Sequence, residues 1–279
     1  MSKKLYTESY IQNIADAIRE KNGSTDKYMV GRMADAILDI QTGADLLALM
    51  TGNEQFNLTD AETPTQATLI PQYMFYGNQN VHDISYNSIV TVGAYAFTQC
   101  PYIGDLNLPG CTGIADNAFL ECRRSSSVSG STVFNLPECI TLGEKAFYEF
   151  CLQNDTLVVN LPKLKTIGNQ AFGSYYSTYR LNVKEMNLPK VETIGNGVFR
   201  YAKITDLKLG SENSEITIGT SIFNTATITN LYVYATTPPT LPSAGLGNAP
   251  THIYVPAASV EAYQGATGWS NYTIEAIPE

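Results

Sequence analysis

The sequence lacks the features that mark membrane-spanning, secreted and metal-binding proteins. Its 279 residues contain no run of 18 apolar residues and no basic and then apolar leader with a small-residue cleavage site. We therefore expect no membrane insertion, and synthesis in a cytosol. The two histidines, His82 and His252, lie far apart, and the five cysteines include no Cys-x-x-Cys pair. This spacing offers neither a zinc site nor a disulfide framework, so we expect no metal and no cofactor.

Catalytic motifs are missing as well. The sequence has no Gly-x-Ser-x-Gly, no glycine-rich phosphate loop, and carboxylates that are scattered without a pattern. We therefore expect no catalytic residues and a non-enzymatic function.

Basic residues are absent from two long stretches. Residues 41–122 contain eight acidic side chains and no Lys or Arg, and residues 209–279 contain five acidic side chains and no base. Residues 123–208 carry eleven basic and seven acidic side chains, a net +4 in a chain whose total is −9. The acidic total argues against nucleic-acid binding. The positive middle is either an ordinary solvated surface or one that meets an anionic polymer.

What the sequence does have is a phrase that it repeats from about Ile70 onwards. The clearest copy runs from Leu164 to Phe172, Leu-Lys-Thr-Ile-Gly-Asn-Gln-Ala-Phe, and is followed by Met186-Asn-Leu-Pro189. Copies follow one another every 22 to 28 residues, which predicts one structural unit per turn of a solenoid. The repeated phenylalanine should stack into a continuous core. It recurs at Phe75, Phe97, Phe119, Phe147, Phe172, Phe199 and Phe223.

Glycine and cysteine recur at fixed places in the phrase. The cysteines follow either the phenylalanine or a Leu-Pro pair, so we expect most of them to be reduced, buried and stacked turn upon turn. The glycines should each mark a tight backbone bend. They are Gly93, Gly143, Gly168, Gly195 and Gly219.

The first 43 residues predict a separate helical hairpin. Two segments with apolar residues at helical spacing have nearly the same sequence, Ile14-Ala-Asp-Ala-Ile18 and Met33-Ala-Asp-Ala-Ile37. Two short helices bury little surface alone, so the hairpin either caps the solenoid or docks to a partner. The docking side chains would be Ile11, Ile14, Ile18, Met33 and Ile37.

The chain divides into four parts. Residues 1–43 form the hairpin and residues 44–69 a junction with a first strand. Residues 70–235 form the solenoid. Thr236-Thr-Pro-Pro239 breaks the repeat, and residues 236–279 form a terminal turn with the chain's single tryptophan, Trp269.

Two stretches resemble known families. The repeat, over roughly 200 residues, is similar to BspA-like (Treponema-type) leucine-rich repeats, whose turn reads L-x-x-L-x-L-P and then I-G-x-x-A-F-x-x-C. Departures such as Ile114-Ala115 and Met74-Phe75 affect single turns. This resemblance implies short parallel strands joined by irregular or 3-10 segments, with Trp269 closing the core. The run Tyr10–Gly23, followed by Met33–Ile37, resembles the N-terminus of many tail and minor structural proteins of phages of Gram-positive bacteria.

One candidate binding surface is the middle residue of each strand triplet, which should point away from the core. Four asparagines in register are unexpected on a sheet. They form either a structural amide ladder or part of a polar strip suited to hydroxyl-rich glycans. Aligned turn by turn, the positions are Ser85, Asn107, Asn135, Asn160, Asn187, Lys208, Tyr232 and Tyr254.

A second candidate surface comes from insertions in three successive turns, at residues 123–132, 152–156 and 173–180. Insertions at equivalent places emerge on one side of a solenoid, and that side often binds. The alternative is tolerated loop length. The mixture of Tyr, Ser and Arg is typical of binding loops. Its candidate residues are Arg123, Arg124, Tyr175, Tyr176, Tyr179 and Arg180.

Three functions remain open. The first, favoured by the leader, is a phage tail or baseplate adhesin that is made in the host cytoplasm. It would bind other tail proteins through its helices and a bacterial cell-envelope glycan or protein through its repeats. The second is a BspA-like adhesion protein at a bacterial cell surface. The third is an enzyme accessory or carbohydrate-binding module. A homotrimer is common in phage fibres, but no heptad repeat requires one here.

Overall fold

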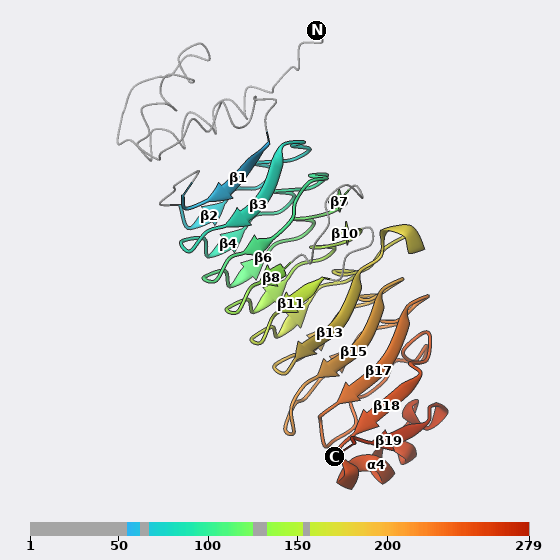
Figure 1. The fold of residues 1–279 in the computed structure, drawn as a ribbon. Helices are drawn as coiled ribbons and strands as arrows, with labels where there is room; N and C mark the ends of the chain where they lie inside the picture. Colours follow the sequence, from blue (N-terminus) through green and yellow to red (C-terminus); the bar gives the residue numbers. More distant parts are fainter. Residues whose placement is uncertain (1–54, 62–66, 125–132, 153–156, 279) are drawn as a thin grey trace, which may run out of the picture.

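The protein forms an elongated stack of coils, which Figure 1 shows running from the first strand to a small helical end. This computed structural model describes residues 55–61, 67–124, 133–152 and 157–278. The helical hairpin expected over residues 1–43, with Ile11, Ile14, Ile18, Met33 and Ile37, lies outside the described residues. Each coil contributes strands to two faces, and every neighbouring pair of strands is parallel. The solenoid predicted from the repeat is confirmed.

One face carries the longer strands, in two successive sheets. Isolated bridge pairing between Leu157 and Val183 marks the point where the first sheet gives way to the second. The first sheet contains β1 (Phe56–Thr59), β3 (Val81–Ser85), β5 (Leu106–Asn107), β8 (Val133–Asn135) and β11 (Val158–Asn160). The second contains β13 (Asn182–Leu188), β15 (Lys203–Leu209), β17 (Thr227–Val233), β18 (His252–Val255) and β19 (Ile274–Ala276).

The other face is one continuous seven-stranded sheet of two-residue strands. In each strand the first residue faces outward and the second is buried. This sheet passes unbroken beside the junction of the first two. It contains β2 (Leu69–Ile70), β4 (Thr91–Val92), β6 (Gly113–Ile114), β9 (Thr141–Leu142), β12 (Thr166–Ile167), β14 (Thr193–Ile194) and β16 (Thr217–Ile218).

The core is a column of phenylalanine rings. From Phe75 to Phe223, each repeat phenylalanine lies 5.0 to 6.0 Å, centroid to centroid, from the next, and all seven are at most 4% exposed. Burying one phenylalanine contributes about 1.5–3 kcal/mol. The column confirms the predicted ladder and explains why one ring is needed in every coil.

The repeat glycines serve a purpose other than the one expected. None of the five has a positive φ. An added Cβ at Gly168 would lie 2.5 Å from Glu144 N in the preceding coil, and one at Gly195 would lie 2.7 Å from Asn169 N. The close approach of two coils therefore requires glycine here. The left-handed turn lies two residues later, at Tyr95, Lys145 and Gln170 for example, where the side chain is usually not glycine.

The four described cysteines line the core, as expected. Cys100 and Cys122 donate their thiols to the carbonyl oxygens of Phe75 and Phe97, over 2.9 and 3.0 Å. Burial raises the pKa of Cys100 to about 12 and that of Cys111 to about 11, and it raises the pKa of Cys122 well above its ordinary value. These thiols are therefore packing groups rather than nucleophiles.

The C-terminal end closes the core with a short helical segment. Trp269, fully buried, donates its indole Nε1–H to the carbonyl oxygen of Pro239 over 2.6 Å. Tyr263 in α4 (Val260–Gly265) donates to the carbonyl oxygen of Ala235 over 2.7 Å, and the two rings meet edge to face. The predicted role of Trp269 as the closing side chain is confirmed. Across the described ranges, no helix combines the length and apolar character needed to span a bilayer.

Candidate functional site

The triplet positions form a row on the outer face of each of the two long-strand sheets. Ser85, Asn107, Asn135 and Asn160 are in register on β3, β5, β8 and β11. Each amide Nδ2–H donates to the side-chain oxygen of the coil before it. The distances are 2.9 Å from Asn107 to Ser85, 2.7 Å from Asn135 to Asn107 and 2.7 Å from Asn160 to Asn135.

This geometry favours the structural interpretation of the asparagines. Each side chain in the middle of the ladder uses one donor and one acceptor on its neighbours, so it stabilises coil stacking directly. The described hydrogen bonds of the ladder end at Asn160, where the first sheet ends. Asn187 is exposed on β13 and begins a row of different chemistry.

The second sheet carries two adjacent outward columns. In one, Asn187, Lys208, Tyr232 and Tyr254 are in register; in the other, Glu185 faces Asp206, which faces Asn230, which faces His252. Asn230 Nδ2–H donates to Asp206 Oδ1 over 2.7 Å, and Lys208 Nζ lies 3.0 Å from Glu185 Oε1. Donor side chains on β15 and β17 are therefore paired with acceptors on the strand before them.

Aromatic rings dominate the far end of these columns. Tyr232 and Tyr254 stack with centroids 5.0 Å apart, and His252 stacks on Tyr254 at 5.7 Å. His252 Nδ1 also lies 3.0 Å from Glu275 Oε1 on β19. Tyr232 and Tyr254 stack from strand to strand, whereas His252 and Tyr254 stack along β18, so the three rings form one aromatic cluster.

The charges of this surface are coupled. The hydrogen bond from Lys208 to Glu185 raises the pKa of the lysine. Desolvation raises the pKa of Tyr232, and the nearby Asp206 carboxylate adds to the effect. Both side chains therefore keep their protons at neutral pH, and Tyr232 remains a hydrogen-bond donor.

The described flanks of the three insertions come together on one edge of the stack, as predicted. Strand β7 (Arg123–Arg124) pairs with β10 (Cys151–Leu152) (Figure 1), and the 3-10 helix η1 (Ser177–Tyr179) lies within the third insertion. Residues 125–132 and 153–156 lie outside the described residues, as does the side chain of Arg124. Of the candidate residues on these insertions, the structure describes the side chains of Arg123, Tyr175, Tyr176, Tyr179 and Arg180.

An ion pair between the half-buried Arg123 and the buried Glu149 organises this edge. Glu149 is 3% exposed, and its Oε2 accepts hydrogen bonds from Nε and Nη2 of Arg123, the first over 2.9 Å. The guanidinium carbon of Arg123 also lies 4.6 Å from the centroid of the Tyr179 ring. Arg123, expected to bind a ligand, is thus committed to holding the loops together.

Tyr175 and Tyr176, in contrast, face solvent with 58% and 57% of their surface exposed. Arg200 stacks its guanidinium group on Tyr175, 4.8 Å from the ring centroid. Arg180 is half-buried just after η1. The two tyrosines are therefore the accessible part of the predicted loop surface.

Several residues of these two surfaces were missed by sequence reasoning. Asp206, Asn230 and His252 lie in a column two residues before the triplet centre, a spacing that strand alternation could have revealed. Glu149 and Arg200 follow their repeat phenylalanines by two and one residues, and no sequence signal separates them from ordinary surface charges.

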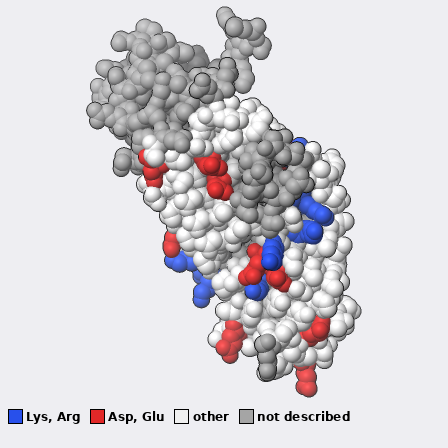
Figure 2. All heavy atoms as spheres, in the orientation of Figure 1, with Lys and Arg blue, Asp and Glu red and all other residues white. Residues whose placement is uncertain are grey.

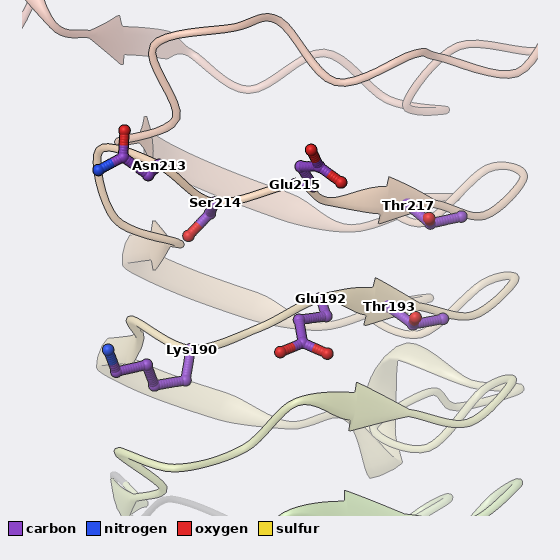
Figure 3. A pocket seen from close by; sticks show the side chains of 7 residues that line it. All are labelled: Lys190, Glu192, Thr193, Asn213, Ser214, Glu215 and Thr217. Atoms are coloured by element: carbon purple, nitrogen blue, oxygen red, sulfur yellow. The ribbon is translucent and has the colours of Figure 1, made fainter.

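A hollow of about 500 Å³ lies elsewhere, between two neighbouring coils (Figure 3). Its lining is polar, and Glu192 is already paired with Lys165 Nζ at 2.6 Å. Within the described ranges, no group of three or more His, Cys, Asp or Glu side chains is placed to hold a metal ion. The lining residues are Lys190, Glu192, Thr193, Asn213, Ser214, Glu215 and Thr217.

Comparison with known proteins identifies the repeat. A search of curated proteins finds no match. A family model described as the BspA type leucine rich repeat region matches six copies, over residues 53–126 and 114–229. The matched segments contain the phenylalanine column, the amide ladder and the insertion edge, and the resemblance inferred from the repeat is confirmed. The chain therefore belongs to the BspA-type leucine-rich repeat family.

Proposed function

We propose that this protein is a non-enzymatic adhesin that recognises a hydroxyl-rich glycan of a bacterial cell envelope through the outer face of β13, β15, β17 and β18. The family supports a protein-binding or adhesion role in general. The observation that carries the finer proposal is the pair of columns on this face, in which Asp206, Asn230 and His252 run beside Lys208, Tyr232 and Tyr254.

The chemistry of the columns supports a glycan. Carboxylate, amide, imidazole and phenol groups bind hydroxyl groups as both donors and acceptors. They recur at the spacing of parallel strands, about 4.8 Å, so the surface offers a hydrogen-bonding side chain at every strand along its length. Such repetition suits a polymer of repeating sugar units better than a single small molecule.

The location that we propose is a phage tail, with the body of the protein directed at the host. The support is the leader, in which Tyr10–Gly23 and Met33–Ile37 resemble tail and minor structural proteins. In this arrangement the leader would dock to other tail proteins. The alternative is an adhesion protein of a bacterial surface, which would also fit the binding or adhesion role that the family supports.

The glycan proposal is tested by measuring binding of the purified protein to Gram-positive cell walls and to polysaccharide and protein fractions prepared from them. Replacing Tyr232 and Tyr254 by phenylalanine keeps the stacked rings but removes two hydroxyl groups. We expect roughly tenfold weaker binding to the polysaccharide, because each lost hydrogen bond contributes about 0.5–1.5 kcal/mol.

The matched control is Tyr73→Phe, which removes a hydroxyl group from an exposed tyrosine of a distant coil and should leave binding unchanged. Binding only to the protein fraction, or equal binding by the Tyr232→Phe/Tyr254→Phe variant, would contradict the glycan site. The tail location has a separate test, mass spectrometry of purified phage particles. Absence of the protein from the particles would favour the bacterial alternative.

A further inference from the structure

The insertion edge presents a second surface, distinct from the glycan-binding face proposed above. We define the tyrosine patch as Tyr175, Tyr176, Tyr179 and Arg200. Tyr175 and Tyr176 are the two most exposed large hydrophobic side chains in the described part of the chain. The coil that carries them has an insertion at this point, so neither side chain is required by the repeat.

The backbone that carries these two tyrosines is fixed before any partner arrives. Ser174 is fully buried; its hydroxyl donates to Tyr176 O over 2.8 Å and accepts from Tyr176 N–H over 3.0 Å. Tyr175 N–H donates to Glu149 Oε1 over 3.1 Å. Since Arg123 holds the other oxygen of Glu149, the loop is anchored to two neighbouring coils.

The rings are supported as well. The ring of Tyr176 contacts those of Tyr175 and Tyr179 at centroid distances of 5.9 and 6.3 Å. The guanidinium group of Arg200 lies over the rings of both Tyr175 and Tyr201. A surface that is already ordered loses little conformational entropy on binding. Rigid tyrosines beside an arginine are the residues in which protein–protein binding energy is concentrated.

The charge around the patch points to the kind of partner. Within the described residues no carboxylate pairs with Arg200, whose buried Nε has no acceptor there. Arg180 directly follows Tyr179 in the chain, and Lys203, three residues after Arg200, pairs in register with Asn182, so the strands next to the patch carry further basic residues. Figure 2 shows blue side chains over the middle of the molecule, with red ones among some of them, and mainly red ones towards both ends.

We propose that the tyrosine patch docks a protein whose surface offers an apolar pocket rimmed by carboxylates. Tyr175 and Tyr176 would enter the pocket, and the guanidinium group of Arg200 would meet a rim carboxylate, a pairing that is strong because it is charge-assisted. The partner is thus a protein with an acidic, apolar docking surface, and it binds independently of the glycan face.

Selection of displayed random short peptides against the purified full-length protein tests this proposal. We expect the enriched peptides to combine Asp or Glu with aliphatic or aromatic residues. Their affinity should fall at least about 30-fold in the Tyr175→Ala/Tyr176→Ala variant, the loss typical of two binding hot spots. It should also fall in Arg200→Gln and weaken as salt is raised.

The control is Tyr73→Ala/Tyr76→Ala, which removes two tyrosines that are 48% and 50% exposed on another coil and should leave peptide affinity unchanged. Thermal unfolding of every variant checks that the fold is retained. Enriched peptides that bind the Tyr175→Ala/Tyr176→Ala variant equally, or that lack acidic residues, overturn the proposal. So does a concentration-dependent dimer, lost in the same variant, because the patch would then be an interface between two copies of this chain.

Discussion

Gly168 differs from alanine by one Cβ atom, and the coil beneath it leaves no room for that atom. The added carbon would lie 2.5 Å from the backbone nitrogen of Glu144, in a segment held by the Phe147 and Phe172 rings. We expect Gly168→Ala to lower the free energy of unfolding by about 1–3 kcal/mol, the usual cost of overpacking. Chemical unfolding of the variant and the natural protein measures the difference.

Gly265 provides the matched control. It lies at the end of α4, and an added Cβ there would meet no atom within 4 Å. Gly265→Ala should be neutral or slightly stabilising, because alanine has less freedom to lose on folding. Equal stability of the two variants would mean that the coils do not approach each other as closely as described.

In the amide ladder, one asparagine side chain links its strand to the strands of the two neighbouring coils. In Asn135→Ala, Asn107 Oδ1 loses its donor and Asn160 Nδ2 loses its acceptor. We expect a loss of about 1–3 kcal/mol in the free energy of unfolding, since two polar groups lose partners at a half-buried position.

A double-mutant cycle separates this effect from the low strand propensity of asparagine. The combined Asn107→Ala/Asn135→Ala variant should cost clearly less than the sum of the two single changes, because the second change removes a group that is already unpaired. Additive costs would show that the amides do not support one another. The same variants should leave glycan binding unchanged if the ladder is purely structural.

The sequence predicted the strands and their register because one residue pattern recurs in every coil. The phenylalanine column and the outward row from Ser85 to Tyr254 follow directly from that pattern. The roles of Gly168 and Arg123 did not follow, because they depend on distances between coils. The repeat pattern predicts which residues face inward. It does not predict how closely the next coil approaches or which charged side chains that coil places nearby.

Stability against pH is a property of the whole stack, since buried thiols occur along its first half. The pKa of Cys100 and of Cys139 is raised by burial to about 12, and that of Cys111 to about 11, from an ordinary value of 9.0. Below pH 9 the thiols are protonated in both the folded and the unfolded chain, so they do not make the free energy of unfolding depend on pH. Above pH 9 they ionise only in the unfolded chain, so the free energy of unfolding falls.

The expected fall is about 1 kcal/mol per thiol for each pH unit above 9, until the folded-state pKa is reached. Chemical unfolding under reducing conditions between pH 8 and pH 10.5 measures it. A Cys100→Ala/Cys122→Ala variant should show a shallower decline than the natural protein. Identical slopes would indicate that these thiols are not protected by burial.

The long strands of this protein lie across its long axis, and that orientation decides how it responds to tension (Figure 1). Tension along this axis acts parallel to the hydrogen bonds between neighbouring coils. These bonds therefore break in sequence, one coil after another, rather than many at once in shear. On the long-strand face, an isolated bridge between Leu157 and Val183 joins the first sheet to the second, in place of a continuous ladder. If the protein links a particle to a cell, as we propose, its body would lengthen coil by coil under tension and so limit the force on the attachment.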